Sequence, residues 1–242
     1  MNNLAQSRNA IRHLLSQHDP ADGMASYYAF HHADAKTHLV TSPADADRAE
    51  GYIAISRTGY DLFRPFLTMR LPLHNMDVCR HLIVEALPSG TAVIAQVPSA
   101  YFPLMQAFFH IESAQGMALY QLRKERFQSE ISLMVTRSLS PSGLPRFAIR
   151  NQEGDPVAAA AMNWQSPYFA EISINSKPGY RRQGWGKSVL SAMVEYVLEN
   201  GRLPLYVAAE DNDASIALAR KVGFVRNGAT VTFFQGTLRE MG

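Results

Sequence analysis

The sequence predicts a mixed α/β protein built from two domains, and three observations lead to this prediction. Short runs of β-branched and aromatic residues, bounded by turn residues, occur along the whole chain. In the second half these runs alternate with segments of helical period. The stretch from Arg137 to Pro145 contains two prolines, a glycine and three serines, which indicates a loop and a domain boundary. We therefore expect one α/β domain in residues 1–136 and a second in residues 137–242.

The elements of the N-terminal half follow from residue spacing. Apolar residues from Leu4 to Leu15 recur near one face and predict a helix over 4–17. Residues 81–87 fit either a helix or a strand, and residues 101–112 have helical spacing. Runs rich in β-forming residues, separated by turns, predict strands at Tyr27–Phe30, His38–Thr41, Tyr52–Ser56, Phe66–Leu71 and Thr91–Val97.

The C-terminal half has a clearer order of elements. Its strands are predicted at Arg146–Asn151, Val157–Trp164, Phe169–Ser176 and Leu205–Ala209, with closing strands at 229–234 and 236–238. A helix after Gly186 ends near Glu199, where Asn200-Gly201 is a typical C-cap, and a second helix covers Asp213–Val222. The order is β-β-β-α-β-α-β. The first half is also strand-rich, which leaves a degenerate structural duplication open.

The composition is that of an ordinary globular protein and disfavours several classes. Hydrophobic residues make up 47% and charged residues 18% of the chain. A net charge of +2 gives no strong field for nucleic acid or an anionic membrane. No run approaches the roughly 18 apolar residues of a membrane span, and the N-terminus lacks the apolar stretch of a signal peptide. The single cysteine, Cys79, fits a reducing compartment and a buried position, so we expect a cytoplasmic protein.

The segment from Ser176 to Ser188 carries the clearest chemical signal. Glycines between a strand and a helix let the backbone approach a ligand closely. The unpaired amides of the first helical turn, with the helix dipole, form an anion site. Arg181, Arg182 and Lys187 add positive charge. The segment therefore predicts phosphate or pyrophosphate binding, although its glycine spacing fits neither a P-loop nor a dinucleotide fingerprint.

Two motifs in this half resemble the signatures of the GNAT superfamily of N-acetyltransferases. The first is Arg-x-x-Gly-x-Gly, with Arg181, Gly184 and Gly186. The second begins at Asn212 and continues through Ser215 to Leu-x-x-Lys-x-Gly-Phe, which ends at Phe224. The resemblance covers residues 147–225 well. It implies a GNAT-type mixed central sheet flanked by helices in the C-terminal half. The N-terminal domain resembles the degenerate domains of two-domain members, including glycine N-acyltransferase-like ones, and lacks the first motif.

The resemblance also implies a binding site for acetyl-CoA and no metal. In the family the loop cradles the coenzyme A pyrophosphate, and the pantetheine and acetyl group insert between two splayed parallel strands. Here these strands are Glu171–Ser176 and Leu205–Ala209, and the backbone N–H of Ile174 or Ser176 is expected to polarise the thioester carbonyl. The expected cofactor-binding residues are Ile174, Asn175, Ser176, Arg181, Arg182, Gln183, Gly184, Trp185, Gly186, Lys187, Ser188, Asn212 and Ser215.

Two catalytic residues are expected from the resemblance. Glu171 begins the third strand, where the family often places a glutamate that deprotonates the amine directly or through water. The family commonly places a tyrosine acid where this chain has Ala219, so Ser215, Tyr168 or water is left to protonate the departing thiolate. All eight histidines lie at or before His110, and the pair His31-His32 is interpreted as surface or strand-lining.

We therefore expect an acyltransferase that moves an acetyl group from acetyl-CoA to the primary amine of a small molecule. The amine attacks directly in a ternary complex. The alternatives are a protein or peptide N-acetyltransferase and a non-catalytic acyl-CoA-binding sensor. Beyond acetyl-CoA and an amine acceptor, no nucleic acid or membrane partner is expected, and a homodimer is compatible with the sequence.

Overall fold

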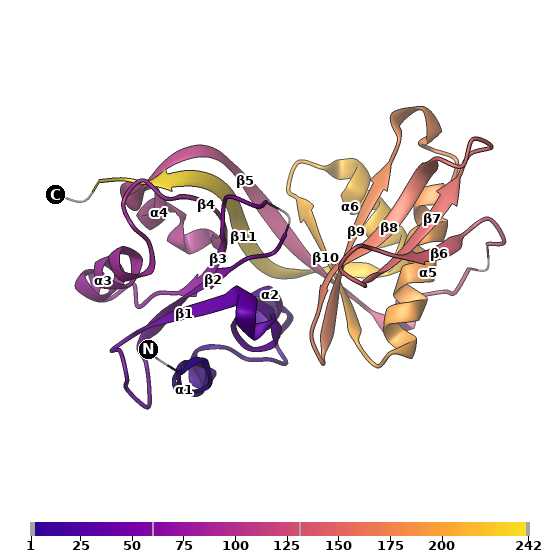
Figure 1. Ribbon diagram of the computed structural model, residues 1–242. Coiled ribbons are helices and arrows are strands. Elements are labelled where there is room, and N and C mark those ends of the chain that lie inside the picture. The colour runs from indigo at the N-terminus through magenta and orange to yellow at the C-terminus, as the bar shows by residue number, and fades with distance from the viewer. Residues whose placement is uncertain (1–2, 60, 131, 241–242) are drawn as a thin grey trace. The chain divides into compact units, whose positions relative to one another are not determined.

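The computed structural model describes residues 3–59, 61–130 and 132–240 and divides the chain into two compact units (Figure 1). Unit 1 comprises the described residues of 1–117 and 230–242, and unit 2 comprises those of 118–229. Two long strands, β5 (Phe109–Leu122) and β11 (Phe224–Leu238), contribute residues to both units. No helix in the described ranges is long and apolar enough to span a membrane.

Unit 1 contains a mixed sheet with helices on both faces. Its strands follow the order β1 (Thr37–Ser42), β2 (Gly51–Ser56), β3 (Phe66–Arg70), β4 (Ala92–Pro98) and β11. The first two pairings are antiparallel, β3 and β4 are parallel, and β4 and β11 are antiparallel. Helices α3 (Met76–Ala86) and α4 (Phe102–Phe108) bury one face, where Leu67, Leu82 and Phe109 are at most 1% exposed.

The other face of unit 1 packs against an N-terminal helical segment. Helix α1 (Leu4–Ala10) is followed by a 3-10 turn at Arg12–Leu14, so the predicted helix over 4–17 is shorter than expected. Further along lie a 3-10 turn at Pro20–Asp22, helix α2 (Gly23–Ser26), a π-helical turn at Tyr27–His31 and a 3-10 turn at Asp34–Lys36. Ile11, Leu39 and Tyr52 form the buried centre of this layer.

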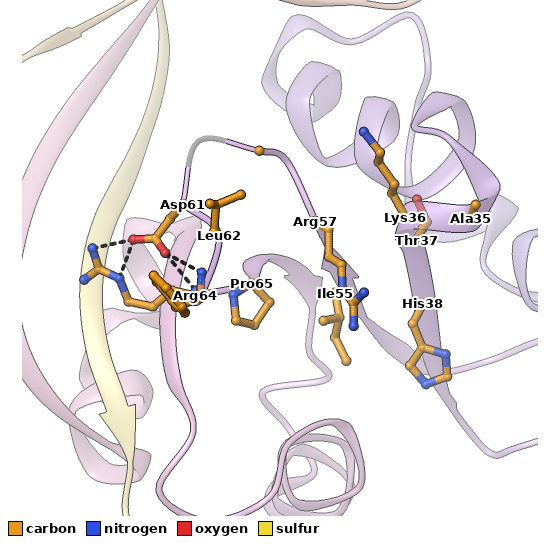
Figure 2. Close-up of a pocket in the computed structure, with 12 residues that line it drawn as sticks. Ala35, Lys36, Thr37, His38, Ile55, Arg57, Asp61, Leu62, Arg64 and Pro65 are labelled. Carbon is orange, nitrogen blue, oxygen red and sulfur yellow. Dashed lines mark hydrogen bonds and ion pairs between the residues drawn. The ribbon is translucent and has the colours of Figure 1, made fainter. Parts of the chain in front are cut away.

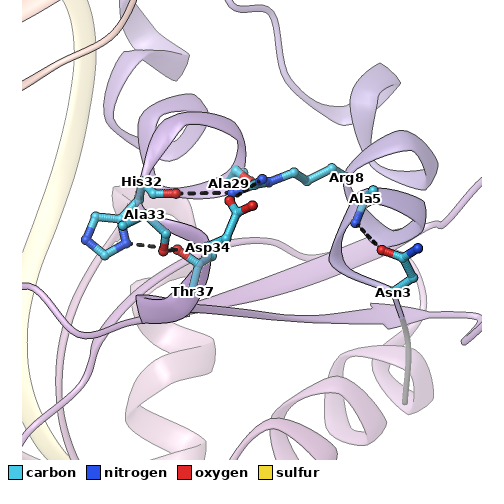
Figure 3. Close-up of polar contacts among 8 residues, drawn as sticks. All are labelled: Asn3, Ala5, Arg8, Ala29, His32, Ala33, Asp34 and Thr37. Atoms are coloured by element: carbon cyan, nitrogen blue, oxygen red, sulfur yellow. Dashed lines mark hydrogen bonds and ion pairs between the residues drawn. The ribbon is translucent and has the colours of Figure 1, made fainter.

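The predicted strand at Tyr27–Phe30 is wrong, because tertiary hydrogen bonds hold this segment in a helical turn. Arg8 donates from Nε to the carbonyl of Ala29 at 2.9 Å and from Nη2 to the carbonyl of His32 at 3.1 Å (Figure 3). The same guanidinium forms an ion pair with Asp34 at 2.6 Å. His32 is only 9% exposed, so it is not a surface residue, and its Nδ1 lies 2.8 Å from Thr37 Oγ1 at the start of β1, which fits the strand-lining alternative.

Other expectations for unit 1 need smaller corrections. Residues 81–87 fall mostly within α3, which settles the ambiguity in favour of a helix. The helical spacing of residues 101–112 is realised only in α4, because Phe109 already begins strand β5. Cys79 is buried as expected, and burial raises the pKa of its thiol.

Unit 2 contains the elements that were predicted for the C-terminal half. Its sheet follows the order β6 (Thr136–Leu139), β7 (Pro145–Arg150), β8 (Pro156–Gln165), β9 (Phe169–Ser176), β10 (Leu203–Ala209) and β5. Helices α5 (Trp185–Glu199) and α6 (Asp213–Val222) pack on one face around Ile172, Val194 and Phe224. The mixed α/β fold class is confirmed, and the two expected closing strands are one strand, β11.

The stretch rich in proline and serine has a local role in unit 2. Residues 140–144 form the turn of the β6–β7 hairpin, in which Gly143 N–H donates to the carbonyl of Ser140 at 2.9 Å. The domain boundary predicted between residues 136 and 137 stays a prediction. The compact units divide the chain at other places, within β5 and β11.

The same order of elements occurs twice along the chain. The series β1-β2-β3-α3-β4-α4-β5 is matched by β7-β8-β9-α5-β10-α6-β11. In each unit the strand after the second helix is exchanged, since β4 pairs with β11 and β10 neighbours β5. This repetition supports the degenerate duplication that the strand-rich first half left open.

Candidate functional site

The loop between β9 and α5 has a backbone shape that suits glycine. After a 3-10 turn at Pro178–Tyr180, Arg182 has φ +64° and Gly184 has φ +80°. A Cβ added at Gly184 would meet nothing within 4 Å, so glycine is needed there for its dihedral angles and not for space. The loop thereby turns sharply into the first turn of α5.

Gly186 lies in this first turn, where α5 approaches α6. A Cβ at Gly186 would come to 3.3 Å from Leu218 Cδ2 and 3.6 Å from Ser176 Oγ. No side chain caps α5, and the Lys187 N–H donates to the carbonyl of Gly184 at 2.9 Å, so the positive end of the helix dipole is presented by the N–H groups that precede Lys187. This open helix start fits an anionic ligand such as a diphosphate.

Cationic side chains surround the helix start. Arg181 donates from Nε to the carbonyl of Ser176 at 3.4 Å, and Arg182 is exposed. Lys187 forms an ion pair with Glu130, with 2.6 Å between Nζ and Oε2. Both side chains of this pair are substantially exposed, so the pair contributes at most about 1 kcal/mol. An anion at the loop would therefore compete readily for Lys187.

Strands β9 and β10 separate beside this loop. Their parallel register runs from Phe169 opposite Leu203 to Ile172 opposite Tyr206. Beyond that pair β9 continues to Ser176 and β10 to Ala209, with no register between these last residues of either strand. Backbone groups on the inner edges of the separated ends are thus available to an extended ligand. Ile174, Asn175 and Ser176, three of the expected binding residues, lie on this part of β9, which pairs with β8 but not with β10.

The start of α6 is fixed by two side-chain hydrogen bonds. Asn212 caps the helix, with Oδ1 accepting from the Ser215 N–H at 3.1 Å. The Ser215 hydroxyl lies 2.7 Å from the hydroxyl of Tyr206, which reaches it from β10. Tyr206 is buried, and burial raises the pKa of its phenol. Helix capping, which alone would explain Asn212, does not explain the contact between Ser215 and Tyr206.

Glu171 lies on the opposite face of the sheet from α5 and α6, in an uncharged environment. Its side chain accepts from Asn163 Nδ2 at 2.8 Å and from Trp164 Nε1 at 3.1 Å. Asn163 in turn accepts from the Ser173 hydroxyl at 2.8 Å. Burial of the carboxyl raises the pKa of Glu171, and the two neutral donors offset only part of that effect. The carboxyl group therefore holds its proton more tightly than an exposed glutamate does.

A β-bulge brings both donors to Glu171. The β8–β9 register places Met162 opposite Ile172 and then Trp164 opposite Glu171, so Asn163 is the extra residue. In a regular strand without a bulge, residues 162 and 164 would lie on the same face, so Trp164 would point toward the helices as Met162 does. The bulge thus places Trp164 on the face of Glu171.

The expected site residues fall into two groups around the splayed strands. Gly186 brings the loop close to Ser176 at the end of β9 and to Leu218 of α6, whereas Asn212 and Ser215 contact each other at the start of α6. Within the loop and the start of α5, Trp185 stacks on Tyr180, with 5.6 Å between ring centroids, and Ser188 is buried, whereas Gln183 is exposed. Glu171 lies on the opposite face, as described above. Sequence reasoning missed Tyr206, Asn163 and Trp164, because only strand register places them beside Ser215 and Glu171.

In unit 1 the junction between β3 and α3 corresponds to the junction between β9 and α5, but its helix start differs. Strands β3 and β4 also pair briefly, at Phe66 opposite Ile94 and Leu67 opposite Ala95. The following helix α3, however, is capped by Asn75, whose Oδ1 accepts from the Val78 N–H at 3.3 Å. A capped helix start offers an anion fewer free donors than α5 does. This supports the expectation that the coenzyme A site lies in unit 2.

Unit 1 also holds an open cavity of about 880 Å³ between β1, β2 and the loop before β3 (Figure 2). Lys36 and Arg57 line it, while Asp61 is occupied by an ion pair with Arg64 at 2.8 Å and by the amides of Phe63 and Arg64. None of the expected site residues lines this cavity. No group of three or more His, Cys, Asp or Glu side chains that would suit a metal occurs among the described residues.

Comparison with known proteins gives a family for the second half and a fold for nearly the whole chain. Residues 147–233 match the family model described as GNAT acetyltransferase. No curated protein matches the sequence.

Three solved structures resemble the chain over almost its full length, at 10–12% sequence identity, which shows the fold alone. A Drosophila protein has a TM-score of 0.68 over 97% of this chain and 95% of its own, at 10% identity. A GCN5-related N-acetyltransferase from Sphaerobacter thermophilus has a TM-score of 0.65, at 12% identity and 99% and 95% coverage. A tandem GNAT protein from the clavulanic acid biosynthesis pathway has a TM-score of 0.61, at 12% identity and the same coverages.

Proposed function

For this chain, which belongs to the GNAT acetyltransferase superfamily through residues 147–233, we propose transfer of an acetyl group from acetyl-CoA to the primary amine of a small molecule. The observation that carries the proposal is the separation of β9 from β10 beyond Ile172 and Tyr206, directly beside an uncapped helix start. These two features offer places for an extended thioester and for a diphosphate in one unit.

The residues of unit 2 have distinct roles in this proposal. Gly184 and Gly186 shape the loop, the first amides of α5 bind the diphosphate, and Arg181, Arg182 and Lys187 neutralise its charge. Backbone N–H groups at Ile174 or Ser176 stabilise negative charge on the thioester oxygen. Holding the amine and the thioester together removes much of the entropic cost of the reaction.

Glu171 is proposed as the general base. An ammonium group is not a nucleophile, so one of its protons must be removed before attack. The raised pKa of the Glu171 carboxyl favours this role, because the group binds a proton more strongly than an exposed glutamate does. Glu171 is only 6% exposed, so the amine does not need to touch it directly. The proton reaches the carboxylate through a water molecule or along the exposed side chain of Asn163.

We further propose a cellular location and a set of partners for this protein. A cytoplasmic location is supported by the single buried cysteine, and the absence of nucleic acid or membrane partners by the net charge of +2. A homodimer and catalysis without a metal are also proposed.

Calorimetric titration with acetyl-CoA tests the cofactor site. We expect micromolar binding by the parent protein and its loss in an Arg181→Ala, Gly184→Ala double variant. The control is Arg220→Ala, which removes an exposed arginine from the last turn of α6 and should bind like the parent. No binding at millimolar acetyl-CoA would refute the proposed function.

A screen with acetyl-CoA then separates the candidate acceptors. Turnover with small primary amines, abolished in Glu171→Gln, supports the proposed function. Turnover confined to peptides would instead support a protein N-acetyltransferase. Tight binding of acetyl-CoA with no turnover of amines or peptides would support an acyl-CoA-binding sensor. Ala219, which stands where the family commonly has a tyrosine acid, favours this alternative.

A further inference from the structure

The open cavity of unit 1 lies at a junction that the repeat in unit 2 closes with a short turn. The series β1-β2-β3 corresponds to β7-β8-β9. In unit 2 the chain passes from β8 to β9 through residues 166–168, whereas in unit 1 it passes from β2 to β3 through residues 57–65. Described residues of the longer connection line the cavity. The repeated fold does not require this longer loop, and such loops commonly carry binding residues.

Side-chain hydrogen bonds hold the second part of this loop in place. Asp61 Oδ1 accepts from the N–H groups of Phe63 and Arg64 at 2.8 and 2.9 Å. Asp61 Oδ2 accepts from Arg64 Nε at 2.8 Å. Arg64 Nη1 donates to Gln235 Oε1 of β11 at 2.6 Å. The course of residues 61–64 is therefore fixed before any ligand binds, which lowers the entropic cost of binding.

This fixed loop presents two large apolar side chains to solvent at the cavity. Leu62 is 87% exposed and Phe63 is 93% exposed, and both line the cavity. Ile55 and Pro65, which are half-buried, add apolar surface to the lining. Single exposed apolar residues are ordinary on protein surfaces. Two adjacent ones on a fixed loop beside a cavity suit contact with the apolar part of a ligand.

Two cationic residues lie together at the end of the β1–β2 ladder. The last pair of that ladder is Thr37 opposite Ser56. Just beyond it, the Arg57 N–H donates to the carbonyl of Lys36 at 2.9 Å, so Lys36 and Arg57 are neighbours across the two chain segments. Both residues are exposed and line the cavity. No ion pair of either side chain is found within the described ranges.

The charge of the lining is therefore not balanced within the cavity. Its cationic side chains include Lys36, Arg57 and Arg64, and its carboxylate is that of Asp61. Both oxygens of Asp61 are engaged by the loop itself, as described above. Figure 2 shows Arg57 across the opening from the pair that Asp61 forms with Arg64. An anion in the opening would relieve the repulsion between the neighbouring charges of Lys36 and Arg57.

We propose that this cavity binds a small organic acid, with its carboxylate at Arg57 and Lys36 and its apolar body against Leu62 and Phe63. The guanidinium fork of arginine pairs with a carboxylate through two parallel hydrogen bonds. The cavity of about 880 Å³ lies within the size range of small-molecule sites. The inference does not rest on the proposed acetyl transfer, because none of the expected coenzyme A residues lines the cavity.

A phosphate or coenzyme A ligand suits this cavity less well. Phosphate sites in loops use backbone N–H groups, but the N–H groups of Phe63 and Arg64 are already occupied by Asp61. The counterpart of the β9–α5 loop in unit 1 is the junction at residues 71–75, and none of these residues lines the cavity. The lining therefore offers side-chain cations and apolar surface, which match a carboxylate with a hydrocarbon body.

Nuclear magnetic resonance of methyl-labelled protein tests the ligand class. Ile55→Val and Leu62→Met assign the two methyl signals of the cavity. The probes are 3-phenylpropionate and 4-methylpentanoate, the neutral 3-phenylpropanamide, and inorganic phosphate. At least one of the two acids should shift both methyl signals saturably, with a dissociation constant at or below about 1 mM. The amide should bind at least about tenfold more weakly, because it lacks the charge.

Three outcomes of this titration would overturn the inference. The first is no saturable shift with either acid. The second is equal affinity for 3-phenylpropionate and its amide, which would leave no role for the cations. The third is a shift with phosphate as large as that with the acids, which would show an adventitious ion only.

Exposed-residue variants locate the binding without disturbing the fold. Arg57→Gln should weaken binding of the acids by at least about tenfold, and Phe63→Ser by about fivefold. Arg12→Gln removes an exposed arginine of unit 1 that does not line the cavity, and this matched control should bind like the parent. Thermal unfolding checks that all three variants stay folded. Equal losses in Arg57→Gln and Arg12→Gln would overturn the inference, since they would reveal only general charge attraction.

A titration with acetyl-CoA separates this cavity from the cofactor site. Arg57→Gln should bind acetyl-CoA within about twofold of the parent, because Arg57 lies outside the loop before α5. A loss as large as that of the Arg181→Ala, Gly184→Ala double variant would assign the cavity to the cofactor and overturn the inference. Failure of the parent to bind acetyl-CoA, with the acids still bound, would refute the proposed function and leave this inference standing.

Discussion

The indole Nε1–H of Trp164 donates to Oε2 of Glu171 at 3.1 Å, from the position directly across the β8–β9 register. Asn163, the residue of the bulge, donates to the other oxygen at 2.8 Å. Neither donor is charged, so burial decides the direction of the Glu171 pKa, which is raised. The single extra residue in β8 thus places both neutral donors at the carboxyl of the proposed base.

The pH dependence of turnover should report this carboxyl. A general base works only when ionised, so the rate at saturating acetyl-CoA should rise with pH through the raised pKa of Glu171. Asn163→Ala removes a donor that stabilises the carboxylate, so the rise should move to higher pH. Rate profiles of the parent and the variant measure the shift.

Ser173→Ala is the matched control for this experiment. Ser173 contacts Asn163, and no hydrogen bond to Glu171 is found for it within the described chain. Its profile should stay close to that of the parent protein. A profile of Asn163→Ala that rises at the same pH or lower would contradict the assignment of the base.

Stability should also depend on the charge of Glu171. Because its folded-state pKa is raised above the ordinary 4.5, the folded state binds the proton more tightly than the unfolded state does. The contribution to the free energy of unfolding is fully present below 4.5 and is lost as pH rises through the folded-state pKa. Urea unfolding of the parent and Glu171→Gln across this range measures the effect.

The difference between the two proteins isolates this group from all others. The glutamine stays neutral, so the stability of the variant relative to the parent should increase with pH and then level off. A difference that does not change with pH, or that falls, would show that the carboxyl is not destabilised by burial.

The two motif glycines should respond differently to alanine. Gly184→Ala places a side chain at φ +80° and should destabilise the fold by about 1 kcal/mol, or shift the loop, with at least about tenfold weaker acetyl-CoA binding. In Gly186→Ala the new Cβ would lie 3.3 Å from Leu218 Cδ2. This methyl group is the end of a flexible side chain and can move by a few tenths of an ångström.

Calorimetry and thermal unfolding compare these two glycine variants. Gly186→Ala should unfold close to the parent and lose less affinity for acetyl-CoA than Gly184→Ala. The reverse order of affinities would mean that close approach of the ligand at Gly186, and not the turn at Gly184, determines binding.

Glu130 should oppose anion binding by holding Lys187. Glu130→Gln removes the carboxylate at 2.6 Å from Lys187 Nζ and should tighten acetyl-CoA binding by about threefold, consistent with an exposed pair worth under about 1 kcal/mol. The gain should decrease at high salt, because exposed charges are screened. Titrations at two salt concentrations measure it, and unchanged affinity at low salt would place Lys187 outside the site.

The sequence by itself determined the features that depend on neighbouring residues in the chain. The helices after Gly186 and Asn212, the strands at Val157–Trp164 and Phe169–Ser176, and the glycine-containing loop between the second of these strands and the first helix follow from local period, capping and glycine placement. These local signals are strong because each element is specified within about a dozen residues.

Tertiary structure decided what depends on pairing between distant segments. The helical turn at Tyr27–His31 is held by Arg8, and the exchange of β5 and β11 requires strands from the opposite halves of the chain. The meeting of Tyr206 with Ser215, and of Trp164 with Glu171, depends on strand register and a bulge. Register is fixed by burial of whole faces against partners far away in the sequence, so residue spacing alone does not reveal it.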